Sequence, residues 1–163
     1  MKGTDKFLIG IVAGIVVLIV AAFAIVLTRP APTYKSDDAA EGVAFNYLFA
    51  LDKNDYPRAY SYLSRTLKGR PSSAENMARD IERRCYGCNR GGDSSSWSVE
   101  SSRTVGSNTV VTVRTTSYST GIFGSTYDST LEMRLTREEG VWKIVSLDSY
   151  WPYCWNTGGG CGN

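Results

Sequence analysis

The chain of 163 residues contains no histidine. Histidine is the side chain best suited to proton transfer near neutral pH, so its absence excludes every histidine-based catalytic triad and most zinc sites. The part of the chain beyond residue 36 also lacks a large net charge, since it contains 14 basic and 15 acidic side chains. This near-neutral balance gives no electrostatic argument for binding nucleic acid. No segment repeats at a fixed period, and the length of this part fits one domain with one core.

One long apolar run is present near the start of the sequence. Residues 7–27, FLIGIVAGIVVLIVAAFAIVL, contain no charged side chain. A helix of this length spans roughly 30 Å, which is the thickness of the hydrocarbon layer of a bilayer. We therefore expect a transmembrane helix at residues 7–27, preceded by a cytoplasmic tail at residues 1–6. A cleaved secretory signal is the alternative, but its apolar core is usually about 7 to 15 residues long.

The flanks of this run bear on orientation and partners. Before the apolar run stand two positive side chains, Lys2 and Lys6, and one negative side chain, Asp5. This slight excess of positive charge favours a cytoplasmic N-terminus and an extracytoplasmic remainder in a single-pass protein of the cell membrane. Gly10 and Gly14 form a GxxxG pair, which lets two helices approach closely. The helix is thus either a plain anchor or also a docking element for a membrane protein or a second copy.

A short linker and a helix follow. Residues 28–36 include two prolines, which cannot continue a helix. From Ser36 onward, apolar side chains recur at helical spacing as far as residue 51, with Asp37 and Asp38 in the first turn. The pattern predicts an amphipathic helix that begins at Ser36.

Two more helices are expected before the chain becomes rich in glycine and serine. Residues 55–63 predict a short helix with Asp55 as its cap. Ser72 and Glu75 have the spacing of a capping box and predict the start of a third helix.

Beyond the glycine- and serine-rich stretch the apolar period changes to two, which is typical of strands. Four strands are expected, at residues 97–105, 109–118, 127–137 and 141–150. The connections after the first and third strands are short, which predicts antiparallel hairpins. The fold class is therefore α+β, with three helices packed on a curved antiparallel sheet of about four strands.

Four segments of this part match a known fold. They are YLFAL at 47–51, DYPRAYSYLS at 55–64, WSVE at 97–100 and GVWKI at 140–144. With these segments, residues 37–150 resemble the nuclear transport factor 2-like superfamily, whose fold is a cone. The chain looks most like the small membrane-anchored or secreted bacterial domains of that superfamily, which are often of unknown function.

The resemblance also implies where an active site would lie. Enzymes of the superfamily place an aspartate or histidine in the mouth of the cone, supported by tyrosine or a second carboxyl. Asp128 beside Tyr127 is the pair to consider, but adjacent strand residues face opposite sides of a sheet and cannot both line one pocket. We carry over no catalytic residue, and we expect no enzymatic activity and no cofactor.

The four cysteines lie in two pairs, Cys85 with Cys88 and Cys154 with Cys161. In an exported domain they suggest two disulfides, and all three connectivities stay open, including a bridge from the first pair to the tail. A redox-active motif fits poorly, because Cys85 follows a helix C-terminus, where the dipole opposes a thiolate. A four-thiolate zinc or iron site is the alternative, although the six-residue gap in the tail is loose for one. We expect no bound metal.

A basic patch is one candidate contact surface. Between residues 65 and 90 seven basic side chains stand against three acidic ones, and Arg83, Arg84 and Arg90 close the stretch. The patch suits anionic lipid headgroups or an acidic partner. It is equally explained as a solvated helix face with internal ion pairs.

The tail at residues 151–163 is the second candidate surface. Together with residue 150, Trp151, Tyr153 and Trp155 place four aromatic side chains within six positions. Such density is typical of core closure, of a contact surface or of a membrane-interface belt, and we favour packing within the domain.

These features together predict a single-pass, membrane-anchored, non-catalytic binding or accessory module, with the bilayer and a membrane protein or a second copy as partners. Its simplest form is a protein-interaction subunit of a membrane complex. The alternative is an extracytoplasmic small-molecule-binding or sensory domain, which should contain a buried uncompensated polar group. A small acid/base enzyme is the third possibility and requires a carboxyl with a strongly shifted pKa.

Overall fold

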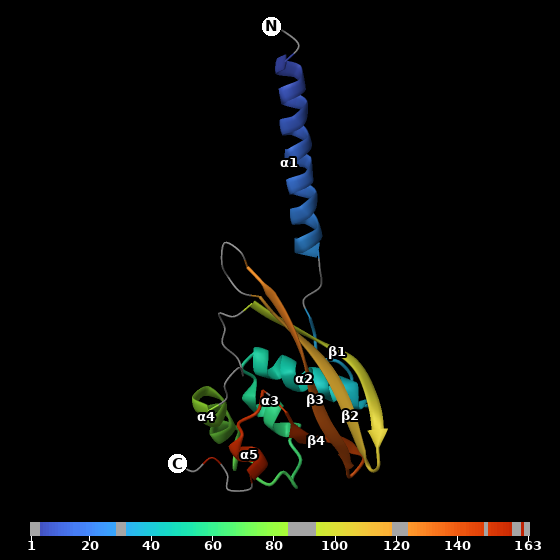
Figure 1. Cartoon of the computed structure of the whole chain (residues 1–163), viewed down its shortest axis with the longest axis vertical. Coiled ribbons are helices and arrows are strands. Elements are labelled where there is room, and N and C mark those ends of the chain that lie inside the picture. The colour runs from blue at the N-terminus through green and yellow to red at the C-terminus, as the bar shows by residue number, and fades with distance from the viewer. Residues whose placement is uncertain are drawn as a thin grey trace. The chain divides into compact units, whose positions relative to one another are not determined.

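The computed structural model describes residues 4–28, 32–84, 94–118, 124–148, 150–157 and 161 (Figure 1). The chain divides into two compact units, one ending at Thr33 and the other beginning at Tyr34.

The first unit contains the helix α1, Thr4–Thr28. Its segment Phe7–Ile25 is long and apolar enough to cross a membrane by length and composition, and none of it is buried. Gly10 and Gly14 both lie in this segment, and a Cβ atom added to either would meet nothing within 4 Å. The expected helix is therefore present, with open surface at both glycines.

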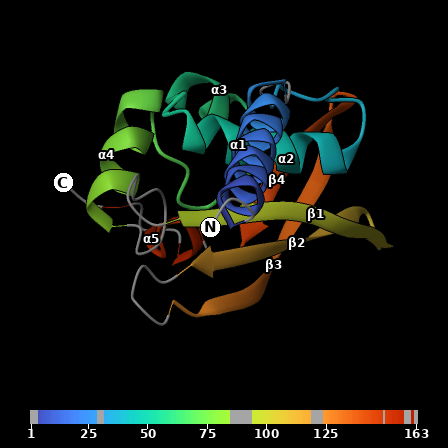
Figure 2. The same ribbon diagram turned by 90° about the horizontal axis from the view of Figure 1, so that it is seen from above.

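The second unit is built on a four-stranded antiparallel sheet in the order β1-β2-β3-β4. The strands are Ser94–Val105 (β1), Asn108–Tyr118 (β2), Thr126–Glu138 (β3) and Val141–Leu147 (β4). The sheet is curved, and the helices α2 and α3 lie on one side of it (Figure 2). All four predicted strands are confirmed, and so are the antiparallel hairpins.

A tight turn between β3 and β4 explains their register. Glu138 pairs with Val141, and the two residues between them, Glu139 and Gly140, have φ angles of 53° and 83°. Positive φ at both central positions is the geometry whose twist matches a β-hairpin. The prediction that β4 reaches residue 150 is wrong, because Tyr150 has a φ of 58°, which a strand does not accommodate.

Among its described residues, the second unit also contains four helices: α2, Ala40–Asp52; α3, Tyr56–Ser61; α4, Ala74–Arg84; and α5, Cys154–Thr157. The first three were expected, whereas α5 was not. Asp55 caps α3 as predicted, since its side chain accepts a hydrogen bond from the Arg58 amide at 3.2 Å.

Two helix starts differ from the predictions. α2 begins at Ala40 instead of Ser36, because the Asp37 carboxylate accepts hydrogen bonds from side chains of the domain instead of capping the helix. The cap of α4 is Ser73, whose hydroxyl accepts from the Asn76 amide at 3.2 Å, so the predicted Ser72 is one residue early.

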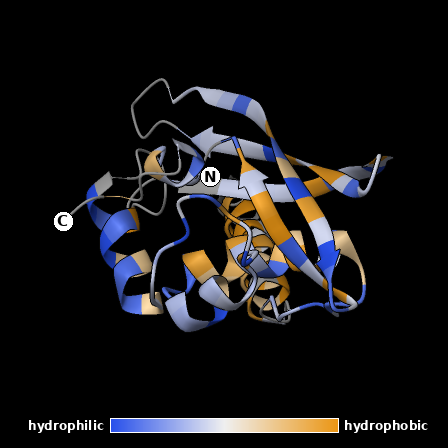
Figure 3. Ribbon diagram, turned by 90° about the horizontal axis from the view of Figure 1, so that it is seen from below, coloured by the Kyte–Doolittle hydropathy of each residue, from blue (hydrophilic) through white to orange (hydrophobic). Residues whose placement is uncertain are grey.

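The core lies between α2 and the facing side of the sheet. On β3 the side chains of Leu131, Met133 and Leu135 are at most 2 % exposed, which confirms the predicted alternation along this strand. Figure 3 shows hydrophobic positions alternating with hydrophilic ones along the strands. Trp151 and Trp155 of the tail belong to the same buried cluster, so the chain after β4 closes the core.

The two edges of the sheet are treated differently. The β4 edge is covered by the chain itself, because the Ile144 amide donates to the Tyr62 carbonyl and the Ser64 amide donates to the Ile144 carbonyl, both at 2.9 Å. Within the described part of the chain, the backbone of β1 forms hydrogen bonds with β2 alone. One edge is thus closed and the other open.

Candidate functional site

The interior of the second unit contains two aromatic side chains whose polar atoms are unpaired. Tyr47 of α2 is fully buried, and its ring centroid lies 6.4 Å from that of Trp151. Among the described residues, neither the Tyr47 hydroxyl nor the Trp151 indole Nε1 has a hydrogen-bond partner. A buried polar group without a partner costs about 1 to 3 kcal/mol, so an unpaired pair of this kind is unusual in a core.

Burial sets the chemistry of this pair. It raises the pKa of Tyr47 above its ordinary value, so the phenol stays protonated at every physiological pH. The indole N–H of Trp151 is a donor only. The pair can therefore donate hydrogen bonds to an acceptor but cannot act as an acid or base near neutral pH.

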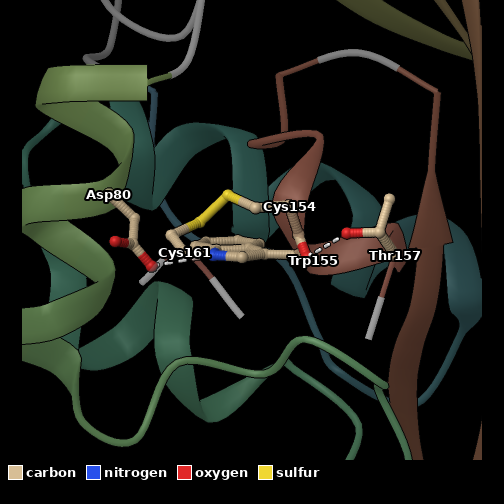
Figure 4. Close-up of a disulfide and its surroundings, with 5 residues drawn as sticks. All are labelled: Asp80, Cys154, Trp155, Thr157 and Cys161. Atoms are coloured by element: carbon tan, nitrogen blue, oxygen red, sulfur yellow. Dashed lines mark hydrogen bonds between the residues drawn. A yellow bond between two sulfur atoms is a disulfide. The ribbon is translucent and has the colours of Figure 1, made fainter. Parts of the chain in front are cut away.

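The neighbouring Trp155 shows how a satisfied indole is arranged. Its Nε1 donates to the Asp80 carboxylate of α4 at 2.9 Å (Figure 4). Its ring meets that of Trp151 edge to face, with 5.0 Å between the ring centroids. The backbone of Gly69 passes so close that an added Cβ would lie 2.4 Å from the Trp155 Cα, and the Gly69 amide donates to the Trp155 carbonyl at 2.9 Å. The tail is therefore fixed to the domain at Trp155.

A third buried polar atom without a hydrogen-bond partner among the described residues lies in the loop between α3 and α4. The Arg70 Nε has no hydrogen-bond partner among the described residues, while its guanidinium stacks over the Tyr60 ring at 4.4 Å. The stacking orients the guanidinium without satisfying this nitrogen.

A polar network fixes the segment that enters the domain, residues 34–38. The Asn46 side chain of α2 is fully buried; its Oδ1 accepts from the Lys35 amide at 2.7 Å, and its Nδ2 donates to the Lys35 carbonyl at 2.8 Å. The same Nδ2 donates to the Asp37 carboxylate at 2.6 Å. Gly42 lets the segment pass, since a Cβ there would lie 1.9 Å from the Ser36 carbonyl oxygen.

Helix α3 holds the same segment from its other side. The Tyr34 hydroxyl donates to Asp55 at 2.9 Å, and the Arg58 guanidinium lies 3.4 Å from the centroid of the Tyr34 ring. Tyr62 donates to the Asp37 carboxylate at 3.1 Å and accepts from Arg58. Burial, followed by the bond to Asp55, raises the pKa of Tyr34, and the bond to Tyr62 raises the pKa of Arg58.

The cysteines show one disulfide inside the tail, between Cys154 and Cys161, whose Cα atoms are 5.1 Å apart (Figure 4). The considered bridge from Cys85 or Cys88 to the tail is therefore wrong, because both tail cysteines bond each other. A four-thiolate metal site is excluded for the same reason, since a disulfide sulfur is not a thiolate. Cys85 and Cys88 lie outside the described residues.

The tail aromatics divide between core and surface. Trp151 and Trp155 are 6 % and 0 % exposed, so their candidacy as contact residues is wrong and the favoured packing role is confirmed. Tyr153 is 79 % exposed and stays available for contact.

The remaining candidates are separate from this interior. Arg83 is exposed near the end of α4, the backbone of Arg84 ends that helix, and Arg90 lies outside the described residues. Asp128 is exposed on β3 and accepts from the Thr116 hydroxyl at 2.7 Å, and Tyr127 is 70 % exposed. The structure thus encloses neither member of the considered acid/base pair.

Sequence reasoning missed Asn46 and the role of Asp37. The one available signal was an asparagine within the apolar stretch AFNYLFAL, because a buried amide in a helix requires partners from another segment.

No protein-family model and no curated protein matches this chain. Among solved structures it is similar to a SEC-C motif-containing protein from Rhodopseudomonas palustris, with 12 % identity, 71 % of this chain and 81 % of that chain covered, and a TM-score of 0.48. An NTF2 variant chain has 16 % identity over 69 % of this chain and 97 % of that one, with a TM-score of 0.46. An NTF2-like protein of unknown function from Cytophaga hutchinsonii has 14 % identity over 69 % and 89 %, with a TM-score of 0.38. The superfamily that the sequence resembles is thus represented among these structures, which assign no ligand or partner to this chain.

Proposed function

We propose that the chain is a membrane-anchored, non-catalytic binding module that presents its domain close to the bilayer surface to a protein partner. The observation that carries this proposal is the fixed segment 34–38, because it shortens the tether. The expected linker was residues 28–36, whereas the chain is bound to the domain from Tyr34 onward.

Chain length sets the reach of the tether. Six Cα–Cα steps separate Thr28, the last residue of α1, from Tyr34, and an extended chain covers at most roughly 3.6 Å per step. If α1 spans the bilayer, Tyr34 lies within about 20 Å of its end. The oxidised pair Cys154–Cys161 supports placement of the domain on the extracytoplasmic side, where disulfides persist.

Exposed aromatic side chains supply a contact surface for the partner. Tyr118 of β2 and Tyr127 of β3 are 48 % and 70 % exposed. Adjacent register pairs bring them to the same end of the sheet, one on each of its faces, so a partner that grips this end contacts both. Tyrosine is enriched among residues that dominate binding energy at interfaces. This end of the β2–β3 pair is the surface that we assign to the partner.

The test is isolation of the full chain in mild detergent, with mass spectrometry of the proteins that accompany it. We expect a defined membrane protein to co-purify, and we expect Tyr118→Ser together with Tyr127→Ser to reduce its yield about tenfold, the effect of roughly 1.4 kcal/mol. Val141→Ser is the matched control, since it removes an exposed apolar side chain from the opposite end of the sheet. A chain that always purifies alone would refute the interaction role, and release by alkaline carbonate would refute the anchor.

A second candidate function rests on the unpaired Tyr47 hydroxyl and Trp151 indole. Both are buried and adjacent, and a small molecule with a carbonyl or carboxylate would satisfy them. Such a ligand, present at 100 times its Kd, stabilises the fold by about 2.7 kcal/mol. A thermal-shift screen of small carboxylic acids and amides tests this function, and Tyr47→Phe should abolish any shift. A screen without any shift would remove this candidate.

A further inference from the structure

The contacts of the segment 34–38 show from which side the chain enters the domain. Tyr34 lies beside the later part of α2, since its ring centroid is 4.9 Å from that of Phe49. Asp38 lies at the other end of the segment, where its carbonyl accepts a hydrogen bond from the Trp142 indole Nε1 at 3.0 Å. The segment therefore runs from Phe49 towards Trp142.

The two ends of the sheet differ. One end, the turn end, has the tight turns that join β1 to β2 and β3 to β4. The other, the tyrosine end, has the exposed side chains of Tyr118 and Tyr127. Trp142 is the second residue of β4 and comes directly after one of the tight turns, so Asp38 lies at the turn end.

A row of aromatic rings connects Tyr34 with the tyrosine end. Tyr34 contacts Phe49, which stacks on Phe45 with 5.8 Å between the ring centroids. Phe45 meets Trp97 of β1 with 4.9 Å between the ring centroids. The residue of β2 that pairs with Trp97 lies roughly 10 Å along that strand from Tyr118, whereas the β1–β2 turn lies roughly 30 Å away along β1. The segment thus begins nearer the tyrosine end and finishes at the turn end.

We infer that the tyrosine end of the sheet faces the bilayer, and that the protein which contacts this end is an integral membrane protein, bound beside the lipid headgroups. The chain enters the domain from that side, and the tether keeps Tyr34 within about 20 Å of the end of α1. The turn end is then directed away from the membrane. The inference rests on the proposed function, because it requires the anchor, and it deepens that function by naming the class of the partner.

An integral membrane protein fits the tyrosine end better than the lipid surface itself. The described residues of this end, at 94–96, 116–118 and 126–128, contain no lysine or arginine and one acidic residue, Asp128. Anionic headgroups attract lysine and arginine, so the charges of this end do not hold it to lipid. Its two exposed tyrosines are of the residue type that dominates binding energy at protein interfaces.

Energy transfer on the full chain in phosphatidylcholine nanodiscs tests the orientation. A genetically encoded fluorescent amino acid replaces Thr126 at the tyrosine end or, as the matched control, Ser107 at the turn end, both of which are exposed. Transfer to an acceptor on the headgroups should be at least twofold more efficient from position 126. Asn46→Ala should remove this difference, because it frees the segment 34–38, and Asn156→Ala should preserve it.

Photocrosslinking in native membranes tests the class of the partner. With p-benzoylphenylalanine in place of Thr126, irradiation should join the chain to a protein that stays in the membrane during alkaline carbonate extraction. The same probe in place of Ser107 should give at most a fifth of this product. Adducts with lipid alone, or with a protein that carbonate releases, would overturn the assigned partner class.

Other outcomes separate this inference from the proposed function. Equal transfer from both ends of the wild type, or a difference that persists in folded Asn46→Ala, would overturn the orientation, which tests it even where a variant fails to fold. Equal transfer together with loss of the co-purifying protein on Tyr118→Ser with Tyr127→Ser would overturn the orientation and leave the proposed function intact. A chain that purifies alone would refute the proposed function even where the transfer difference is present.

Discussion

Replacing Asn46 by alanine should release the segment 34–38 from the domain while the core stays folded. The amide makes three hydrogen bonds, two to the Lys35 backbone and one to the Asp37 carboxylate. Neutral bonds contribute about 0.5 to 1.5 kcal/mol each, and a bond to a charged group about 1.5 to 3. Because the freed backbone groups regain water when the segment opens, we expect a net loss of about 3 kcal/mol from local stability.

Trypsin reports this opening directly, because Lys35 lies inside the fixed segment. When cleavage is slow compared with closing, its rate follows the population of the open state. A loss of about 3 kcal/mol should therefore accelerate cleavage after Lys35 on the order of 100-fold. Mass spectrometry of a fragment that begins at Ser36 measures the rate.

Two comparisons make the result decisive. Asn156→Ala removes an exposed asparagine from α5 and should leave cleavage at Lys35 unchanged. Asn46→Asp keeps one acceptor but places a carboxylate against Asp37, so it should accelerate cleavage at least as much as alanine does. Cleavage of Asn46→Ala within twofold of the wild-type rate, with the same urea midpoint, would refute our account of the segment.

Four further outcomes are expected. Tyr47→Phe should leave the free energy of unfolding unchanged or raise it by up to about 1 kcal/mol in urea titrations, because the Tyr47 hydroxyl has no hydrogen-bond partner among the described residues. A decrease of more than about 1 kcal/mol would show that a bound molecule forms a hydrogen bond with this hydroxyl. Burial raises the pKa of Tyr47, so its contribution to stability is complete below the unfolded pKa of about 10 and falls as the pH rises above it; absorbance at 295 nm should show this phenol ionising only with unfolding. Cys154→Ala with Cys161→Ala should lower the free energy of unfolding by about 2 kcal/mol, since the bridge closes a short loop, and an unchanged urea midpoint would contradict this. Gly42→Ala should accelerate tryptic cleavage as Asn46→Ala does, because its Cβ would meet the Ser36 carbonyl, and a wild-type rate would count against that contact.

The strands were predictable because their information is local. Alternation of apolar and polar side chains requires no knowledge of the partner strand, and β3 shows it in Leu131, Met133 and Leu135. The length of the turn adds the register, since two residues, Glu139 and Gly140, join β3 to β4. Glycine suits the positive φ at position 140, whereas the positive φ of Glu139 is not indicated by its residue type. The end of β4 was missed because the apolar alternation continues to Tyr150, whereas the strand ends at Leu147 and Tyr150 has a φ of 58°, which no residue pattern indicates.

The helix start at Ala40 was not predictable from local composition. Ser36, Asp37 and Asp38 have the residue types of an N-cap, yet Asp37 binds Asn46 and Tyr62, which are 9 and 25 residues away. A tertiary contact of this kind outweighs a cap that contributes about 1 kcal/mol. The candidate site was not predictable for the same reason, because the lack of a hydrogen-bond partner for the Tyr47 hydroxyl depends on residues that are distant in the sequence.

The tail was predictable in its burial but not in its specific contacts. Its density of aromatic side chains favoured core closure over a contact surface, and Trp151 and Trp155 are buried as expected, whereas Tyr153 is exposed. Which cysteine bonds to Cys154 could not be derived, since the spacings permit every pairing. The hydrogen bond from Trp155 to Asp80 joins residues 75 positions apart, and no sequence pattern indicates it.

Adjacent residues of α2 secure both ends of the domain. Asn46 binds the entering segment at Lys35, and Tyr47 packs against Trp151 of the closing segment. A domain usually frays at its termini, where exopeptidases and chaperones first gain hold of a chain. Here the loss of either terminal segment exposes part of α2. Release of one segment therefore weakens the packing of α2 against the other segment. We therefore expect each of the two segments to be digested faster once the other has been released.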